Sequence, residues 1–264
     1  MPISATRRMM AGGGTGARGI KFTPDANTVL WLPGQDDAYS ATIRDRSGNG
    51  NNGTITQAVW TRNNQGTWYL DFDGTNDKIQ LANSSVTSCR ISTKATFKIW
   101  VKLNDLTTAE HTIAGKDTNT LALEYDLEFY DIDSDDNYHV RLLATDNGNG
   151  GDNAHRMFCQ TGNLISDTLW HHIVWAIDLT KGDDTDVIVY KDGGANACPK
   201  AAGSYIASIF AGDEVLEIAE TIRLSGVGKS LKGATALPML SLNSVWTPEQ
   251  VSSSYQQERH LLGV

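Results

Sequence analysis

Residues 68–81 read WYLDFDGTNDKIQL, a stretch with the form of a β-hairpin. Two runs of β-type residues, Trp68–Asp73 and Lys78–Leu81, flank the turn residues Gly74-Thr75-Asn76. Glycine and asparagine readily take the backbone angles that tight turns require, so we expect the chain to reverse direction here. The hairpin predicts an antiparallel sheet around this point of the chain.

The same alternation of short β-type runs and turn residues continues on both sides of the hairpin. Further strands are predicted at residues 28–32, 121–131, 138–144, 170–178, 186–191 and 215–224. Residues 95–103 (ATFKIWVKL) alternate most clearly, because residues at every second position of a strand share a face. One predicted face carries Phe97, Ile99, Val101 and Leu103, and the other carries Thr96, Lys98, Trp100 and Lys102.

Only residues 248–258 have a clear helical pattern. Thr247 is a favourable N-cap, Pro248 suits the first turn, and Gln250 stands three residues after the cap. This spacing predicts a capping box at the start of a short C-terminal helix.

The composition agrees with an all-β protein. Gly, Asp and Asn make up about a quarter of the 264 residues, and these residue types favour turns. The strand runs continue without an evident linker. We therefore predict one domain at residues 22–264, a two-sheet antiparallel jelly-roll sandwich with one short C-terminal helix.

The charge is divided between two parts of the chain. The formal net charge is −9, but residues 1–21 contain Arg7, Arg8, Arg18 and Lys21 and no acidic residue. Residues 22–264 therefore carry −13. We predict a flexible, basic, glycine-rich arm joined to an acidic body, and such a body would repel nucleic acid.

Two further features bound the class of protein. The sequence has neither an apolar run long enough to insert in a membrane nor the apolar stretch of a secretion signal at its start. Three widely spaced cysteines, Cys89, Cys159 and Cys198, allow at most one disulfide, and buried free thiols are the favoured interpretation.

The order of the pieces resembles a known family. The chain looks like the laminin-G-like branch of the concanavalin A-like lectin/glucanase jelly rolls. This resemblance implies the fold but no single function, because lectins, adhesion modules, hydrolases and structural proteins share it. The matching pieces are residues 45–54, 70–81, 96–103, 113–117, 170–178, 189–193 and 246–257.

Residues 124–128 (EYDLE) place Glu124, Asp126 and Glu128 on one predicted strand face. A related jelly-roll family of retaining β-glucanases uses two Glu with an Asp between them. If the chain is a hydrolase, these three residues are the catalytic candidates. The alternative is a strand with its acids pointing outward and Tyr125, Leu127 and Phe129 packed inward, and no catalytic residue is then predicted.

Calcium binding is a second prediction. Ca²⁺ prefers oxygen ligands from Asp, Asn and backbone carbonyls on loops. Asp45, Asn49, Asp73 and Asp77 supply such oxygens on two loops, and the family resemblance implies a calcium ion at the rim of the sandwich. The alternative is ordinary turn chemistry with solvated acids.

Glycan binding on this fold requires accessible aromatic and polar groups. Trp100 lies on the polar face of its predicted strand, and Tyr130 follows the acidic run. Asn147 and Asn149 belong to a glycine- and asparagine-rich loop. These four residues are the predicted glycan contacts.

Three functions remain open. The first is a non-enzymatic structural or attachment protein on a virion surface, such as a capsid decoration, fibre or tail component. Its arm would dock on other structural proteins through Arg7, Arg8, Arg18 and Lys21. The protein would form a homo-oligomer and would also bind a host glycan. The second is an extracellular carbohydrate-binding module, and the third is a glycoside hydrolase.

Overall fold

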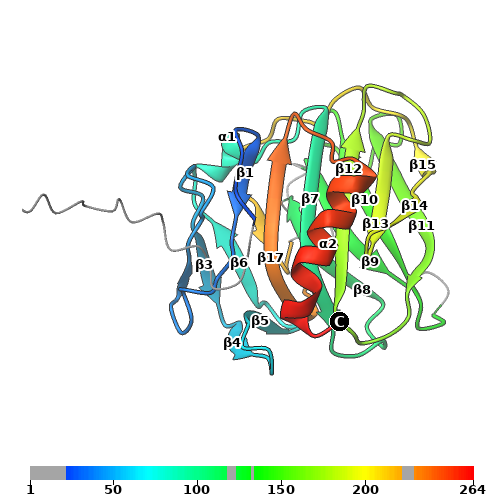
Figure 1. Cartoon of the computed structure of the whole chain (residues 1–264). Helices are drawn as coiled ribbons and strands as arrows, with labels where there is room; N and C mark the ends of the chain where they lie inside the picture. Colours follow the sequence, from blue (N-terminus) through cyan, green and yellow to red (C-terminus); the bar gives the residue numbers. More distant parts are fainter. Residues whose placement is uncertain (1–21, 118–122, 132–133, 222–228) are drawn as a thin grey trace, which may run out of the picture.

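A computed structural model describes residues 22–117, 123–131, 134–221 and 229–264. They form two antiparallel sheets, which confirms the predicted all-β jelly-roll sandwich (Figure 1). Sheet A runs β14 (Gly194–Ala197), β13 (Val187–Lys191), β12 (His171–Asp178), β7 (Lys94–Leu103), β17 (Lys232–Leu242), β5 (Trp68–Asp73) and β4 (Val59–Arg62), with β1 (Thr28–Trp31) also paired to β17. Sheet B runs β15 (Lys200–Gly203), β11 (Arg156–Ile165), β10 (Tyr138–Thr145), β9 (Tyr125–Tyr130), β8 (Glu110–Lys116), β16 (Glu217–Ile218), β6 (Lys78–Leu81), β3 (Gly53–Thr56) and β2 (Thr42–Ile43).

The stretch predicted as a hairpin joins the two sheets, so the hairpin prediction is wrong. Its first strand, β5, pairs with β17 in sheet A, and its second strand, β6, pairs with β3 in sheet B. The two arms of the turn therefore separate into different layers instead of pairing with each other. The stretch thus crosses from one face of the core to the other.

The alternation in β7 sets the layers. Phe97, Ile99, Val101 and Leu103 are buried in the core between the sheets, as their spacing predicts. The opposite face of β7 points away from sheet B. A third layer, helix α2 (Pro248–Leu262), lies across that face of sheet A (Figure 1).

Helix α2 begins as predicted and ends later. The Thr247 side chain accepts a hydrogen bond from Gln250 N, and Thr247 N donates to the Gln250 side chain, so the capping box is present. The helix continues four residues beyond the predicted end, to Leu262. There Gly263 caps it in the left-handed conformation, with φ of 80°. Buried Leu261 and Leu262 explain the extension, because they pack against sheet A.

The remaining short helix is α1 (Ser85–Ser88). No helix among the described residues has the length and apolar character needed to cross a membrane. Cys89, Cys159 and Cys198 are buried and free, as their spacing favours.

Two predicted strands are shorter in the structure. The run at 121–131 is a strand only over Tyr125–Tyr130, and the run at 215–224 only over Glu217–Ile218. Residues 118–122 and 222–228 lie outside the described part of the chain.

Candidate functional site

The three acids of the EYDLE run point away from the core between the sheets. Tyr125, Leu127 and Phe129 belong to that core, so the alternating Glu124, Asp126 and Glu128 lie on the outer face of sheet B. All three carboxylates are nonetheless buried, with no exposed surface. The three acids therefore point away from the core, as one alternative predicted, but they are not exposed to solvent.

Two of these carboxylates lie beside buried cations. Lys116 Nζ is 3.0 Å from Glu124 Oε1, and both side chains are fully buried. Burial raises the pKa of Glu124 and lowers the pKa of Lys116 from their usual values. Arg141 Nη2 lies 3.2 Å from Glu128 Oε1. A hydrolytic carboxylate has to reach its substrate, and buried, charge-paired groups are poorly placed for that role.

Tyr130 lies near Arg141 on the same outer face. The guanidinium carbon of Arg141 lies 4.0 Å from the Tyr130 ring centroid and 4.3 Å from that of Phe158. Both rings are partly exposed. The predicted glycan contact Tyr130 is therefore accessible, although a cation occupies part of its π-surface.

The other predicted glycan residues lie elsewhere. Tyr130 pairs with His139 at the start of β10, while Asn147 and Asn149 follow the end of that strand at Thr145. Six residues of strand separate His139 from Thr145, which is about 20 Å. Tyr130 and the two asparagines are thus at opposite ends of sheet B.

Trp100 is not accessible to a glycan. It is fully buried, and its Nε1 donates a 2.7 Å hydrogen bond to Glu258 Oε2 on α2. The polar face of β7 is covered by the helix rather than by solvent. This placement corrects the prediction that Trp100 contacts a glycan.

The first predicted calcium loop is held by its own hydrogen bonds. Asp45 Oδ1 accepts from the amides of Trp31 and Ser47, and its Oδ2 accepts from Asn51 N. Asn49 Nδ2 donates to Thr28 O. Asp45 thus closes the loop onto β1, and this contact is the ordinary turn chemistry that the sequence left open.

The second calcium loop lies at the other end of the sandwich. Asp73 pairs with Lys232 at the start of β17, while Thr28, beside Asn49, pairs with Ser241 near its end. Nine residues of strand separate the two places, about 30 Å. The two predicted loops therefore cannot share one ion.

Asp77 is the buried member of that second loop. Its Oδ2 accepts from Asp73 N, its Oδ1 has no hydrogen-bond partner among the described residues, and burial raises its pKa. Within the described ranges, no group of three or more His, Cys, Asp or Glu side chains is placed to hold a metal ion.

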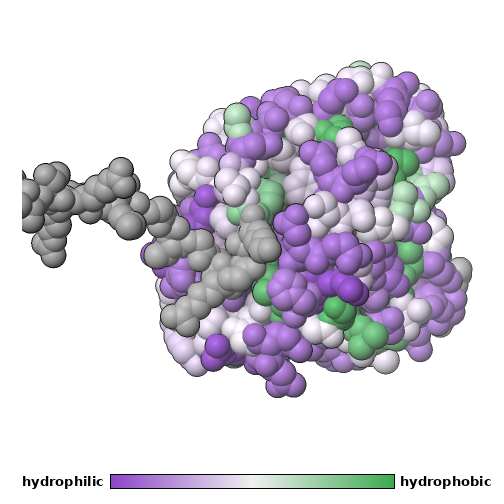
Figure 2. Space-filling view, viewed as in Figure 1, coloured by the Kyte–Doolittle hydropathy of each residue, from purple (hydrophilic) through white to green (hydrophobic). Residues whose placement is uncertain are grey.

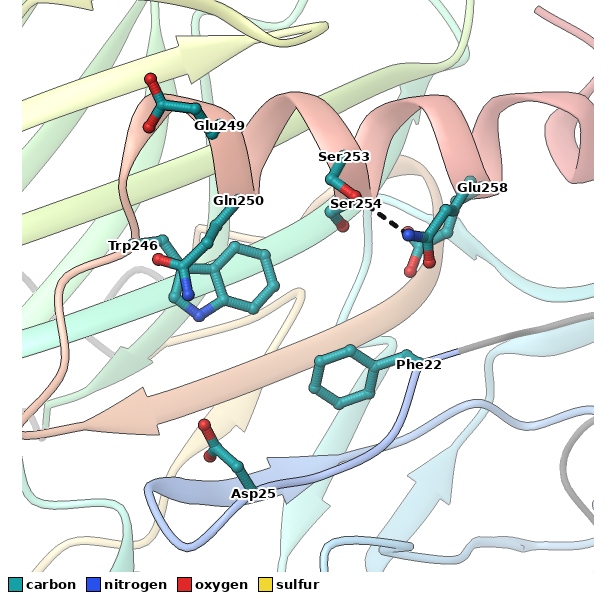
Figure 3. Close-up of a pocket in the computed structure, with 9 residues that line it drawn as sticks. Phe22, Asp25, Trp246, Glu249, Gln250, Ser253, Ser254 and Glu258 are labelled. Atoms are coloured by element: carbon teal, nitrogen blue, oxygen red, sulfur yellow. Dashed lines mark hydrogen bonds between the residues drawn. The ribbon is translucent and has the colours of Figure 1, made fainter.

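A groove of about 380 Å³ runs along α2, a volume typical of ligand sites. One wall is the exposed side of the helix, and the other is the segment that leads into β1 (Figure 3). Its lining residues, mostly polar with two aromatic rings, are Phe22, Asp25, Trp246, Glu249, Gln250, Ser253, Ser254, Gln257 and Glu258.

The two rings of the groove are set at an angle. Phe22 and Trp246 are partly exposed, with their centroids 6.3 Å apart and their planes tilted by 42°. On the helix wall, Gln257 Nε2 donates a 2.9 Å hydrogen bond to Ser253 Oγ, and both side chains are exposed. Ser253 and the dashed line of this bond are drawn in Figure 3. Aromatic faces opposite amides and hydroxyls match the apolar and hydroxyl surfaces of a sugar.

The inner side of the groove is an ion pair. Glu258 Oε1 lies 2.6 Å from Lys98 Nζ, and the ammonium lies 5.6 Å from the centre of the Phe22 ring. This pair fixes the helix on β7 beneath the groove. Around it, the face of the molecule that carries α2 is mainly hydrophilic, with small hydrophobic areas between (Figure 2).

The sequence alone did not identify this groove. Phe22 and Gln257 belong to opposite ends of the described chain, and no motif joins them. Trp246 was visible as an aromatic residue just before the predicted helix, but its partners were not. Arg7, Arg8, Arg18 and Lys21, the predicted docking residues, lie outside the described residues.

A family model for the concanavalin A-like lectin/glucanases superfamily matches residues 73–221, more than half of the chain. The chain belongs to this superfamily. The match begins at the Asp73 turn and includes β6 through β16. Among curated proteins, none matches the sequence.

Several solved structures share the fold at low sequence identity. Domain 4 of AbnA, a GH43 extracellular arabinanase from Geobacillus stearothermophilus solved with arabinotriose, has TM-score 0.56 and 16% identity, over 87% of this chain and 98% of that one. The binding domain of botulinum neurotoxin DC with SialylT has TM-score 0.56 and 10% identity, over 88% and 51%. Trypanosoma rangeli sialidase with sialic acid has TM-score 0.57 and 14% identity, over 91% and 34%. At these identities the likenesses show a shared fold and nothing further.

Proposed function

We propose that this protein is a non-enzymatic attachment protein that binds a glycan in the α2 groove. The observation that carries the proposal is the pairing of two partly exposed rings, Phe22 and Trp246, with the exposed Ser253 and Gln257 side chains across a groove of ligand size. The similarly folded arabinanase domain, which is matched over 98% of its length, was solved with arabinotriose, and this supports a saccharide as the ligand class.

A non-enzymatic role is favoured by the state of the acidic run. Glu124 and Glu128 are buried and lie beside Lys116 and Arg141, whereas catalysis would need them open to a substrate. The alternative, a hydrolase using Glu124 and Glu128, would require rearrangement of this face. An extracellular carbohydrate-binding module is the runner-up, because it uses the same groove without an assembly.

The assembly part of the proposal rests on residues 1–21. Their charge of +4 contrasts with −13 for the rest of the chain, and like-signed acidic bodies need a separate contact to join an assembly. We propose a virion surface as the assembly, with the arm bound to other structural proteins. Calcium at the loop of Asp73 and Asp77 is a separate proposal.

Deleting residues 1–21 is expected to leave the sandwich folded and to abolish incorporation into the assembly. The core, both sheets and α2 are built from residue 22 onward, so the melting temperature should change by less than 2–3 °C. Incorporation is measured by co-sedimentation with assembled particles. Normal incorporation of the truncated protein would contradict the docking role.

Truncating the groove side chains is expected to weaken glycan binding. Trp246→Ala removes a ring that stacks on sugar, and we expect at least a tenfold loss of affinity; Gln257→Ala, at an exposed position, should lose threefold or more. Binding is measured on a glycan array and then by calorimetry, in calcium and in EDTA.

The matched control is Tyr205→Ala, which removes a partly exposed ring outside the groove. It should bind as wild type does. A thermal melt of each variant separates lost binding from lost folding. If wild type binds no glycan in either buffer, the proposed function is wrong.

A further inference from the structure

Tyr39 is the most exposed large hydrophobic residue among those described, at 81%. Its backbone has φ of 67°, in the left-handed region that tyrosine rarely adopts and glycine favours. Its ring meets Trp68 edge to face, with centroids 5.0 Å apart and planes at 73°. The fold thus holds an aromatic ring in solvent on a strained backbone, an arrangement that costs stability and is common at functional positions.

The loop that carries Tyr39 is fixed on several sides. Gln35 accepts from Trp68 N and donates to Trp68 O, at 2.9 and 2.8 Å. Trp60 Nε1 donates to Ser40 O at 2.8 Å. The buried Asp37 carboxylate accepts from Arg44 N at 2.9 Å. The Tyr39 ring is therefore presented by a rigid loop, so its position is settled before any ligand arrives.

A polar hollow of about 470 Å³ lies beside this loop. Two of its lining residues, Ala38 and Ser40, are the neighbours of Tyr39 in sequence. The others are polar or charged: Asp36, Asp37, Thr42, Arg44 and Asn52. Carboxylate, hydroxyl, guanidinium and amide groups together supply donors and acceptors at short spacing. Arg62 adds a guanidinium 5.7 Å from the Trp68 ring.

We propose that Tyr39, Trp68 and the adjacent hollow form a saccharide-binding site, which we call the Tyr39 corner. A sugar ring would stack on Tyr39 while its hydroxyls bond to Asp36 and Arg44 in the hollow. The inference shares a ligand class with the proposed function but rests on a different site, because no residue of the corner lines the α2 groove.

A neutral saccharide fits the corner better than a protein surface. The hollow is lined by Asp36, Asp37 and Arg44, with Arg44 paired to Asp37, rather than by the apolar side chains that fill the centre of a protein interface. Vicinal hydroxyls can accept from a guanidinium and donate to a carboxylate at the same time. The exposed Tyr39 ring supplies an apolar surface on which the apolar face of a sugar can stack.

The test uses Tyr39→Gly, Tyr39→Phe, Tyr205→Ala and Trp246→Ala in the full chain. Glycine suits φ of 67°, so Tyr39→Gly should keep or raise the melting temperature while it removes the ring. The probes are neutral tri- to hexasaccharides of arabinose, xylose, glucose, mannose and galactose, titrated by saturation-transfer NMR. We expect Tyr39→Gly to bind at least tenfold more weakly, with Tyr39→Phe within threefold of wild type.

The outcomes separate the two sites. A loss in Tyr39→Gly that Tyr205→Ala does not share supports the Tyr39 corner. Trp246→Ala reports on the α2 groove: if it also weakens binding, the double variant Tyr39→Gly with Trp246→Ala should bind more weakly than Trp246→Ala alone, and if it changes nothing, the corner binds without the groove. Equal binding by wild type and Tyr39→Gly overturns it. The absence of binding by wild type, with self-association that depends on Tyr39 in sedimentation velocity, also overturns it and assigns the corner to a contact between copies of the chain.

Discussion

Replacing Glu258 with alanine is expected to lower the free energy of unfolding by about 3–5 kcal/mol. The Lys98 side chain is fully buried under α2, and its ammonium lies 2.6 Å from Glu258 Oε1. Trp100 Nε1 donates to the other carboxylate oxygen at 2.7 Å. The alanine variant would leave a buried charge and a buried donor without the partner that each now has, and both are costly.

The comparison variants isolate the charge. Glu258→Gln can still accept a hydrogen bond from Trp100 but cannot neutralise Lys98. Its free energy of unfolding should therefore lie between those of wild type and Glu258→Ala. Gln256→Ala, at an exposed position of the same helix, should change stability by less than about 0.5 kcal/mol. Urea unfolding gives the values. A loss below about 1 kcal/mol for Glu258→Ala would refute the structural role of the pair.

This ion pair also marks the limit of sequence reasoning. The alternation in β7 correctly predicted that Lys98 and Trp100 share the face opposite Phe97 and Ile99. Periodicity states which residues lie on one face, but not whether another element covers that face. A helix 150 residues later covers it here, so Trp100 was predicted as exposed and is buried.

The central strand β17 was not predicted. It contains Gly233 and Pro238, and proline in a run argues against a central strand because it donates no ladder hydrogen bond. The structure places Pro238 in an irregularity of the pairing with β7, between Ala236 and Met239. At Gly233 a β-carbon would lie 2.3 Å from Lys102 O, so only glycine fits the close approach. Both residues are explained by partners that are distant in sequence.

The candidate sites were predicted in part for the same reason. Tyr130 is accessible as expected, and the buried thiols and the Thr247 cap were readable from local spacing. The α2 groove joins Phe22 to Gln257 only after folding, and the Tyr39 corner joins a loop to Trp68. Sites assembled from distant segments leave no fixed spacing in the sequence.

Replacing Lys116 with methionine is expected to destabilise the protein by about 3–5 kcal/mol at pH 8. Lys116 and Glu124 are fully buried, 3.0 Å apart, and Lys116 Nζ also donates to Val86 O at 2.8 Å. Without the ammonium, the Glu124 carboxylate remains buried in a charged state. The same change at the exposed Lys181 should alter stability by less than about 0.5 kcal/mol.

The loss should shrink as the pH falls. Burial already raises the pKa of Glu124 above its usual 4.5, while Lys116 and Arg90 lower it, so the methionine variant should raise it further. Between 4.5 and that raised pKa the folded state binds more protons than the unfolded state. Stability therefore falls as pH rises through this window. Urea unfolding of Lys116→Met and wild type is compared from pH 5 to pH 8, and the difference in free energy of unfolding should be largest at pH 8. A difference that does not depend on pH would contradict the role of Glu124 as the buried charge.

A double variant decides whether the pair serves structure or chemistry. Lys116→Met with Glu124→Leu replaces two buried charges by apolar groups of similar volume, which is often neutral for stability. We expect its free energy of unfolding to lie within about 1 kcal/mol of the wild-type value. Its affinity for glycan in the α2 groove should be unchanged, because neither residue lines that groove. A hydrolase that used Glu124 would instead keep its fold and lose its activity. Retained binding in the refolded double variant would therefore argue that the acidic run of β9 supports the sandwich, and that ligand recognition is located elsewhere on the molecule.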